Sequence, residues 1–146
     1  MLGRSLLSRF DELEARLVTR SFIDSVEKAL VAGLRADLAV RAGTKVPGDV
    51  ENLPRFVRIV RGPGTDDLVT DSPLVDVECF ASTYGDADVL AEDVRQWFHA
   101  LNGRTVGGML VDRVRTATAP AWVDYRNPDT NRFVASYRLE HRQTTT

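Results

Sequence analysis

The 146-residue chain is 43% hydrophobic and 27% charged, with a net charge of −2 at pH 7, values that predict one globular domain of the soluble type. This charge gives no general reason to expect binding to nucleic acid or a membrane, and no apolar run approaches the ~20 residues that span a bilayer. The single cysteine, Cys79, excludes an intrachain disulfide framework and is interpreted as a small buried residue in a protein of a reducing compartment.

Residues 2–18 have the pattern of a short amphipathic helix, with apolar side chains spaced by four, three and four residues at Leu6, Phe10, Leu13 and Leu17. A helix of this length is marginal alone and needs a surface to pack on, in its own domain or another. We therefore expect an N-terminal helix within residues 1–20, followed by one α+β domain over residues 21–146.

A second helix is predicted to begin after Asp24 or Ser25 and to end at Ala42-Gly43. Ala29 and Gly33 give it a thin side that another element can approach closely. Residues 44–53 contain Pro47-Gly48, which predicts a short extended piece followed by a turn.

The segment Arg55–Arg61 is predicted to be a strand that begins after Pro54. Its arginines recur at every third position, so Arg55 and Arg61 lie on one face of the strand and Arg58 lies on the other. Both faces are therefore mixed in character, which favours exposure or a role between subunits.

The stretch from Gly62 to Pro73 is rich in turn-forming residues and is predicted to be a projecting loop between two antiparallel strands. It carries Asp66, Asp67 and Asp71, which are interpreted as a solvated acidic loop and not as a site for a divalent cation.

The strongest pattern lies between Pro73 and Leu101, where a strand feeds a helix. Val75, Val77 and Cys79 alternate with the polar Asp76 and Glu78, which predicts a strand with one buried face and one solvated face. A helical stripe follows, capped by Asp86 or Asp88 and ended by Asn102-Gly103; its apolar residues are Leu90, Val94, Trp97, Phe98 and Leu101.

After a linker over residues 103–108, a strand is predicted from Met109 to Thr118, ended by Ala119-Pro120. A turn at Tyr125–Thr130 leads to a last strand whose buried face carries Phe133, Ala135, Tyr137 and Leu139. The expected fold is α+β: a two-layer domain with a mixed, mostly antiparallel sheet of about four strands packed by helices, plus the N-terminal helix.

No pattern in the chain predicts catalysis. His99 and His141 belong to no ligand-spaced set, and neither a Gly-x-Ser-x-Gly elbow nor a phosphate-binding Gly-x-x-x-x-Gly-Lys occurs. We expect no enzyme activity, no cofactor and no metal.

Charge is distributed unevenly, with nine acids and no base between Gly62 and Asp93 and arginine in excess over the rest of the chain. These regions can pair within one molecule or between neighbouring copies in a ring.

Several motifs resemble the tail terminator (tail completion, minor tail) proteins of long-tailed actinobacterial phages, over about residues 24–142. They are the Leu53–Val57 strand entry, the Val75–Ala81 strand, Ala87-x-x-Leu90-Ala91-x-x-Val94-Arg95, Val111–Thr116, and Asn127-Pro128-x-x-x-Arg132 continuing to Tyr137. The resemblance implies a virion structural protein that forms a closed homo-oligomeric ring, typically of six copies, on the head-proximal end of the tail tube. The ring stops tube polymerisation and provides the surface that joins the head.

The implied partners are the major tail tube protein and the head–tail connector or stopper protein, with the tape measure protein as a further candidate. DNA would pass through the lumen without specific binding, no membrane is involved, and the protein would assemble in the host cytoplasm and reside at the tail–neck junction. We expect the candidate subunit-interface or lumen residues to be Arg55, Arg58, Arg61, Asp66, Asp67 and Asp71. The alternatives are a head–tail connector of the neck and a small non-viral regulatory or ligand-binding domain.

Overall fold

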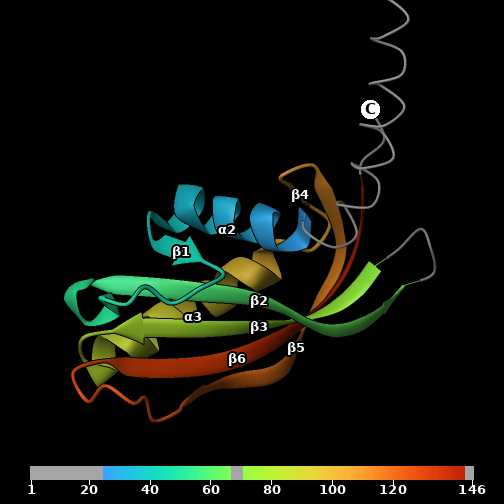
Figure 1. Ribbon diagram of the computed structural model, residues 1–146. Helices are drawn as coiled ribbons and strands as arrows, with labels where there is room; N and C mark the ends of the chain where they lie inside the picture. Colours follow the sequence, from blue (N-terminus) through green and yellow to red (C-terminus); the bar gives the residue numbers. More distant parts are fainter. Residues whose placement is uncertain (1–24, 67–70, 144–146) are drawn as a thin grey trace, which may run out of the picture.

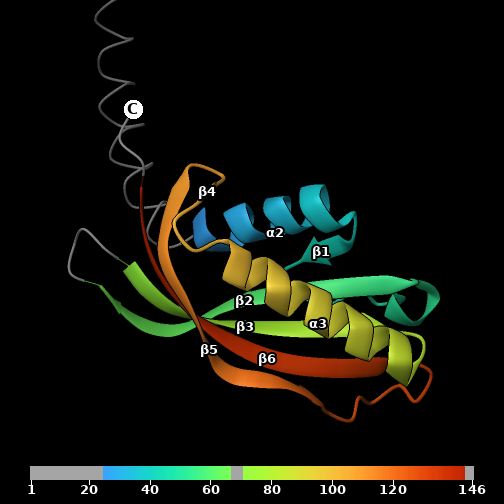
Figure 2. The same ribbon diagram turned by 180° about the vertical axis from the view of Figure 1, so that it is seen from behind.

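A computed structural model describes residues 25–66 and 71–143 of the chain. A six-stranded sheet in the order β1-β2-β3-β6-β5-β4 is covered on one face by two helices (Figures 1 and 2). The elements are α2 (Ser25–Leu38), β1 (Arg41–Gly43), a 3-10 turn (Val50–Asn52), β2 (Arg55–Asp66), β3 (Asp71–Ala81), α3 (Tyr84–Ala100), β4 (Thr105–Val106), β5 (Met109–Trp122) and β6 (Asn131–Gln143). The predicted α+β class is confirmed, whereas the predicted helix at residues 2–18 lies outside the described residues.

The sheet is mixed because β1 pairs with β2 in parallel, while the other four pairs of neighbouring strands are antiparallel. Two short edge strands, β1 and β4, make it larger than the predicted four strands. The prediction that α2 continues to Ala42-Gly43 is wrong. Ala39 takes a positive φ of 52° directly after Leu38, so the helix stops there and Arg41–Gly43 turns back along β2.

The core forms between the helices and the inner face of the sheet. The predicted alternation is confirmed in β3 and β6, whose inward side chains are 6% exposed or less. The apolar stripe of α3 is also buried as predicted. The predicted cap is wrong: Thr83 precedes the helix, and its Oγ1 accepts a hydrogen bond from the Asp86 amide at 3.1 Å. Gly103, with a φ of 74°, follows the helix as expected.

The thin side of α2 is confirmed as a close approach between layers. A Cβ built on Gly33 would lie 2.7 Å from the Trp97 ring of α3 and 2.8 Å from Val106 of β4. The Trp97 indole N–H donates to Asp37 of α2 at 2.8 Å, which fixes the ring in this position. Glycine is therefore required at this contact by its missing side chain.

Strands extend beyond their predicted ends at two places in the structure. β2 continues to Asp66 and β3 begins at Asp71, so the predicted loop at Gly62–Pro73 is wrong in extent, and Figure 1 shows the hairpin continuing past the helical layer. The pairing shifts register between Arg61 and Gly64, which accommodates the turn-forming residues as a bulge. β5 likewise passes through Pro120 with further register shifts, because β4 covers only its first two residues and an uncovered edge tolerates proline.

Candidate functional site: the uncovered face of the sheet

Within residues 25–66 and 71–143, no helix covers the face of the sheet opposite α2 and α3 (Figures 1 and 2). One end of this face is closed by a second apolar cluster, formed by Val50, Phe56 and Phe80 with Val46, Leu53 and Tyr125 packed against them. The segment before β2 therefore folds over part of the face. The remainder carries polar and charged side chains from β2, β3, β6 and β5.

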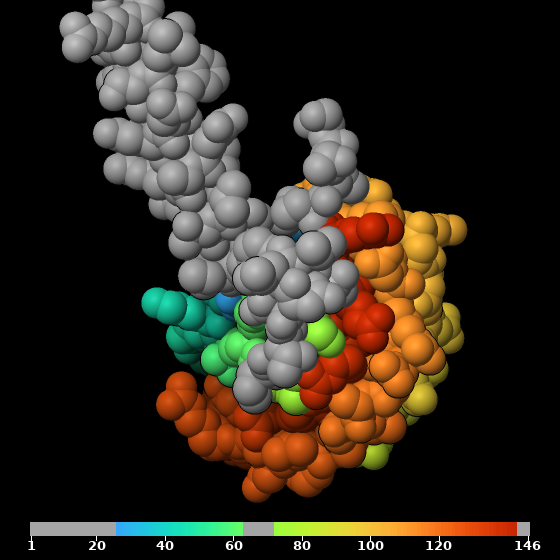
Figure 3. Space-filling model, turned by 90° about the vertical axis from the view of Figure 1, so that its right-hand side faces the viewer, coloured from blue at the N-terminus to red at the C-terminus, as the bar shows by residue number. Residues whose placement is uncertain are grey.

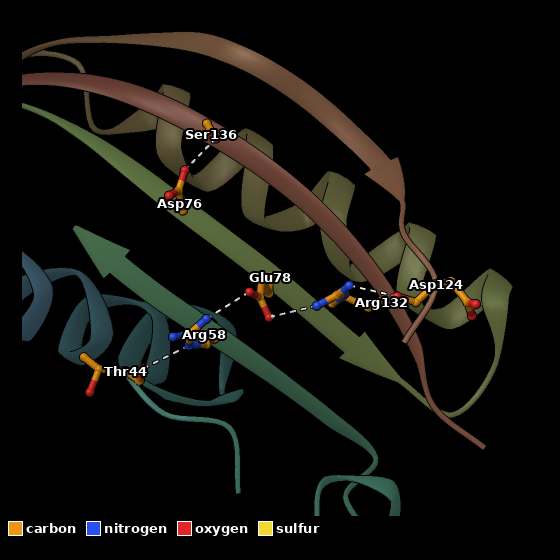
Figure 4. A network of polar contacts seen from close by, with 7 residues as sticks. All are labelled: Thr44, Arg58, Asp76, Glu78, Asp124, Arg132 and Ser136. Atoms are coloured by element: carbon orange, nitrogen blue, oxygen red, sulfur yellow. Dashed lines mark hydrogen bonds and ion pairs between the residues drawn. The ribbon is translucent and has the colours of Figure 1, made fainter. Parts of the chain in front are cut away.

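Glu78 of β3 lies at the centre of an ion-pair network on this face (Figure 4). Its Oε1 is 2.9 Å from Nη1 of Arg58 in β2, and its Oε2 is 3.8 Å from Nη1 of Arg132 in β6. The side chains of Arg58, Glu78 and Arg132 are only 34%, 18% and 22% exposed, respectively. Arg58 also donates to the Thr44 carbonyl at 3.0 Å, and Arg132 to the Asp124 carbonyl at 2.8 Å. One carboxylate thus ties three strands and two loops together.

Strand register produces this network. Arg58 is the cross-strand partner of Glu78, and Asp76 is the partner of Ser136, whose hydroxyl donates to it at 2.8 Å. The prediction that Asp76 and Glu78 lie on a solvated face is therefore wrong, because both are half-buried and paired across the sheet. Their partners come from strands distant in sequence, a relation that alternation within one strand does not reveal.

The three predicted interface arginines have different surroundings in the structure. Arg58 belongs to the Glu78 network, whereas Arg55 donates to the Leu38 carbonyl at the end of α2, with an Nη2–O distance of 3.4 Å. Arg61 is half-buried near the bulge. Asp66 and Asp71 are register partners at the end of the described hairpin, and Asp67 lies outside the described residues. Their role at a subunit boundary or lumen stays a prediction.

A hollow of about 540 Å³ lies at the end of α2, beside β1. Its charged lining is entirely basic, from Arg35, Arg41 and Lys45, but the Arg35 guanidinium already donates to the Ala42 carbonyl at 2.6 and 3.1 Å. Within residues 25–66 and 71–143, no three His, Cys, Asp or Glu side chains are placed to hold a metal ion. Neither helix in these ranges has the length and apolar character needed to cross a membrane.

The buried thiol and phenol of the core are held neutral. Burial raises the pKa of Cys79 to about 12, and the Glu78 carboxylate adds to the rise. Burial also raises the pKa of Tyr137, whose ring stacks on Phe98 with centroids 4.4 Å apart. A protonated, enclosed thiol is a poor nucleophile, so Cys79 acts as the buried core residue that was predicted.

One exposed feature was not predicted from the sequence. Tyr84 and Trp122 are 57% and 45% exposed where α3 begins and β5 ends, and we call this pair the aromatic patch. The Tyr84 ring lies 6.5 Å from the Trp122 ring and 5.2 Å from that of Phe133, between centroids. The sequence offered only a weak indication of this patch, because Tyr84 stands beside a glycine and Trp122 lies beyond Pro120, where the strand was predicted to end.

No protein-family model and no curated protein matches the sequence. The fold does have a solved counterpart. A chain in the structure of the virion of a native gene transfer agent particle superposes with a TM-score of 0.63, over 84% of this chain and 98% of that one. The two sequences are 12% identical, so the likeness shows a shared fold.

Proposed function

We propose that this protein is a structural component of a phage-like virion and acts as its tail terminator. In this role it forms a ring on the head-proximal end of the tail tube, halts addition of tube subunits and offers the surface that joins the head. The observation that carries the proposal is the fold, which covers nearly the whole of a chain in the gene transfer agent virion. The resemblance of the strand and helix motifs to tail terminators supports the same conclusion.

The architecture suits a part that is assembled with others. The two described helices cover one face of the sheet, and the Glu78 network stiffens the other face. The β2–β3 hairpin continues past the helical layer and carries Asp66 and Asp71, so we place it against a neighbouring copy or the lumen. Acidic residues lining a lumen would let DNA pass without adhering to the wall.

The partners in this proposal are further copies of the chain, the major tail tube protein, the connector or stopper protein of the neck, and the tape measure protein as an additional contact. The protein would assemble in the host cytoplasm and remain at the tail–neck junction. A connector in the neck uses similar rings and is the alternative within a virion. A regulatory or ligand-binding domain is the alternative outside a virion, and the basic hollow beside β1 favours it over an enzyme.

Imaging of tube ends tests the proposal. Purified protein is mixed with tail tubes of the cognate tube protein, and tube length and end structure are recorded by negative-stain microscopy. We expect rings at one end of each tube and no further elongation there. If the hairpin contacts a neighbouring copy, an Asp66→Arg/Asp67→Arg variant should lose ring formation, while Asp49→Arg, exposed in the loop before β2, should keep it. Rings that bind the portal complex and ignore tubes would favour the connector instead.

A further inference from the structure

We propose that the aromatic patch is the docking surface for an arginine-bearing end of a second copy of this chain. This inference rests on the ring-forming function proposed above and names the surfaces that meet. The patch lies at the Trp122 end of β5, on the side covered by α3. The matching surface, which we call the arginine patch, lies at the other end of the β5–β6 pair on the uncovered face and consists of Arg113, Arg115 and Arg142.

The aromatic patch is apolar at its centre and acidic beside it. Tyr84 and Trp122 expose about half of their surface, which is unusual for side chains that stabilise a protein most when buried. Asp86 and Asp88 follow in the first turns of α3, are exposed, and have no ion-pair partner among residues 25–66 and 71–143. Aromatic faces next to carboxylates are the surroundings that a guanidinium group prefers, since it stacks on rings and pairs with carboxylates.

The arginine patch has guanidinium groups that remain available to bind a partner. Register places Arg113 and Arg115 opposite Glu140 and Arg138 on the uncovered face, away from the inward Val114 and Leu139. Arg115 is 3.4 Å from Glu140 and Arg142 is 3.4 Å from Asp112, but these arginines are 55% and 50% exposed, and ion pairs in water are weak. Arg113 is exposed and has no ion-pair partner in the described part of the chain.

The two patches cannot meet within one molecule. Arg113 and Trp122 pair with Glu140 and Phe133, which are seven residues apart along β6, so the two residues are separated by roughly 23 Å. Figure 2 shows the two ends of β5 on opposite sides of the domain, and in Figure 3, which is seen from the right-hand side of Figure 1, orange and red atoms of β5 and β6 lie next to one another. Salt screens charges beyond about 8–10 Å, so this complementarity acts only between copies.

The position of the patches also decides the type of assembly. Each copy offers one patch at each end, so every contact joins unlike surfaces and leaves one of each free for the next copy. Such a heterologous contact generates a ring when its rotation closes and a filament when it does not. Unlike surfaces at opposite ends therefore provide the contact that a terminator ring needs.

Charge reversal of each patch tests the proposal. Asp86→Arg/Asp88→Arg makes both surfaces basic, and Arg113→Glu/Arg115→Glu makes both acidic. We expect each variant alone to lose at least tenfold in association constant by sedimentation velocity. An equimolar mixture should regain assembly, with the two variants alternating in rings of even number. Trp122→Ala should weaken association, whereas Asp49→Ala, at an exposed position in the loop before β2, should not.

Circular dichroism checks that each variant is folded. Restored assembly in the mixture is a second control, because misfolded subunits would not assemble. If wild-type subunits gather only on tube ends, the same variants and mixture are scored there by counting occupied ends. If both charge-reversed variants assembled as well as the wild type, this inference would be overturned and the terminator proposal would still stand. Failure of the wild type to bind tubes would instead count against the terminator proposal. Loss of tube binding in Trp122→Ala with self-association intact would assign the patch to the tube protein and overturn the second-copy proposal.

Discussion

Replacing Glu78 with glutamine tests whether the network on the uncovered face stabilises the fold. The substitution keeps the shape of the side chain and removes its charge, so Arg58 and Arg132 keep their positions but lose their carboxylate partner. A hydrogen bond to a charged group contributes about 1.5–3 kcal/mol to stability, and exposed ion pairs contribute less than about 1 kcal/mol. With side chains 18–34% exposed, we place the loss at about 1–2 kcal/mol.

That loss converts into a measurable shift in melting temperature. Unfolding entropy is about 2.1 cal mol⁻¹ K⁻¹ per residue, which for 146 residues gives a decrease of about 3–6 °C. Thermal unfolding is followed by circular dichroism at low protein concentration, because self-association would raise the apparent stability. Glu92→Gln is the matched control, since Glu92 is 53% exposed and lies 4.0 Å from Arg95 in α3, and it should shift the melting temperature by less than about 2 °C. Equal shifts for the two variants would refute the reasoning that the network is stabilising because it is half-buried.

Three further predictions concern the core and the helix start. Gly33→Ala should destabilise the protein by about 1–3 kcal/mol in urea unfolding, because its Cβ would lie 2.7 Å from the Trp97 ring; a gain in stability would show that the layers can move apart. Thr83→Ala should cost about 1 kcal/mol by loss of the cap and Thr83→Ser should cost less, a ranking that the same assay can disprove. Cys79 and Tyr137 both have raised pKa values, so the folded chain retains protons that the unfolded chain loses, and stability should fall as the pH rises from about 9 towards 12. A flat urea midpoint between pH 8 and 10.5 would contradict that sign.

Elements with a local periodic signal were predicted well. β3, α3 and β6 each bury a single face, so alternation or a helical stripe is enough to place them. The predicted close approach at Gly33 was also correct, because a missing side chain on a buried helix face has few other uses.

The errors concern features that depend on distant partners. The extension of β2 to Asp66 needs β3 beside it, and the passage of β5 through Pro120 depends on an uncovered edge. The partners of Glu78 come from two other strands, so its apparent exposure was misleading. Arg58 lies in an internal ion pair, and its interface role stays a prediction.

The position of this protein in an assembled particle tests the account most directly. Particles are produced with an epitope tag on the chain and imaged by electron microscopy with gold-labelled antibody. We expect label at a single collar where the tail tube meets the head, and particles lacking the protein should have tails of irregular length that are not joined to heads. Label distributed along the tube or absent from the particle, with normal tails formed without the protein, would contradict the account.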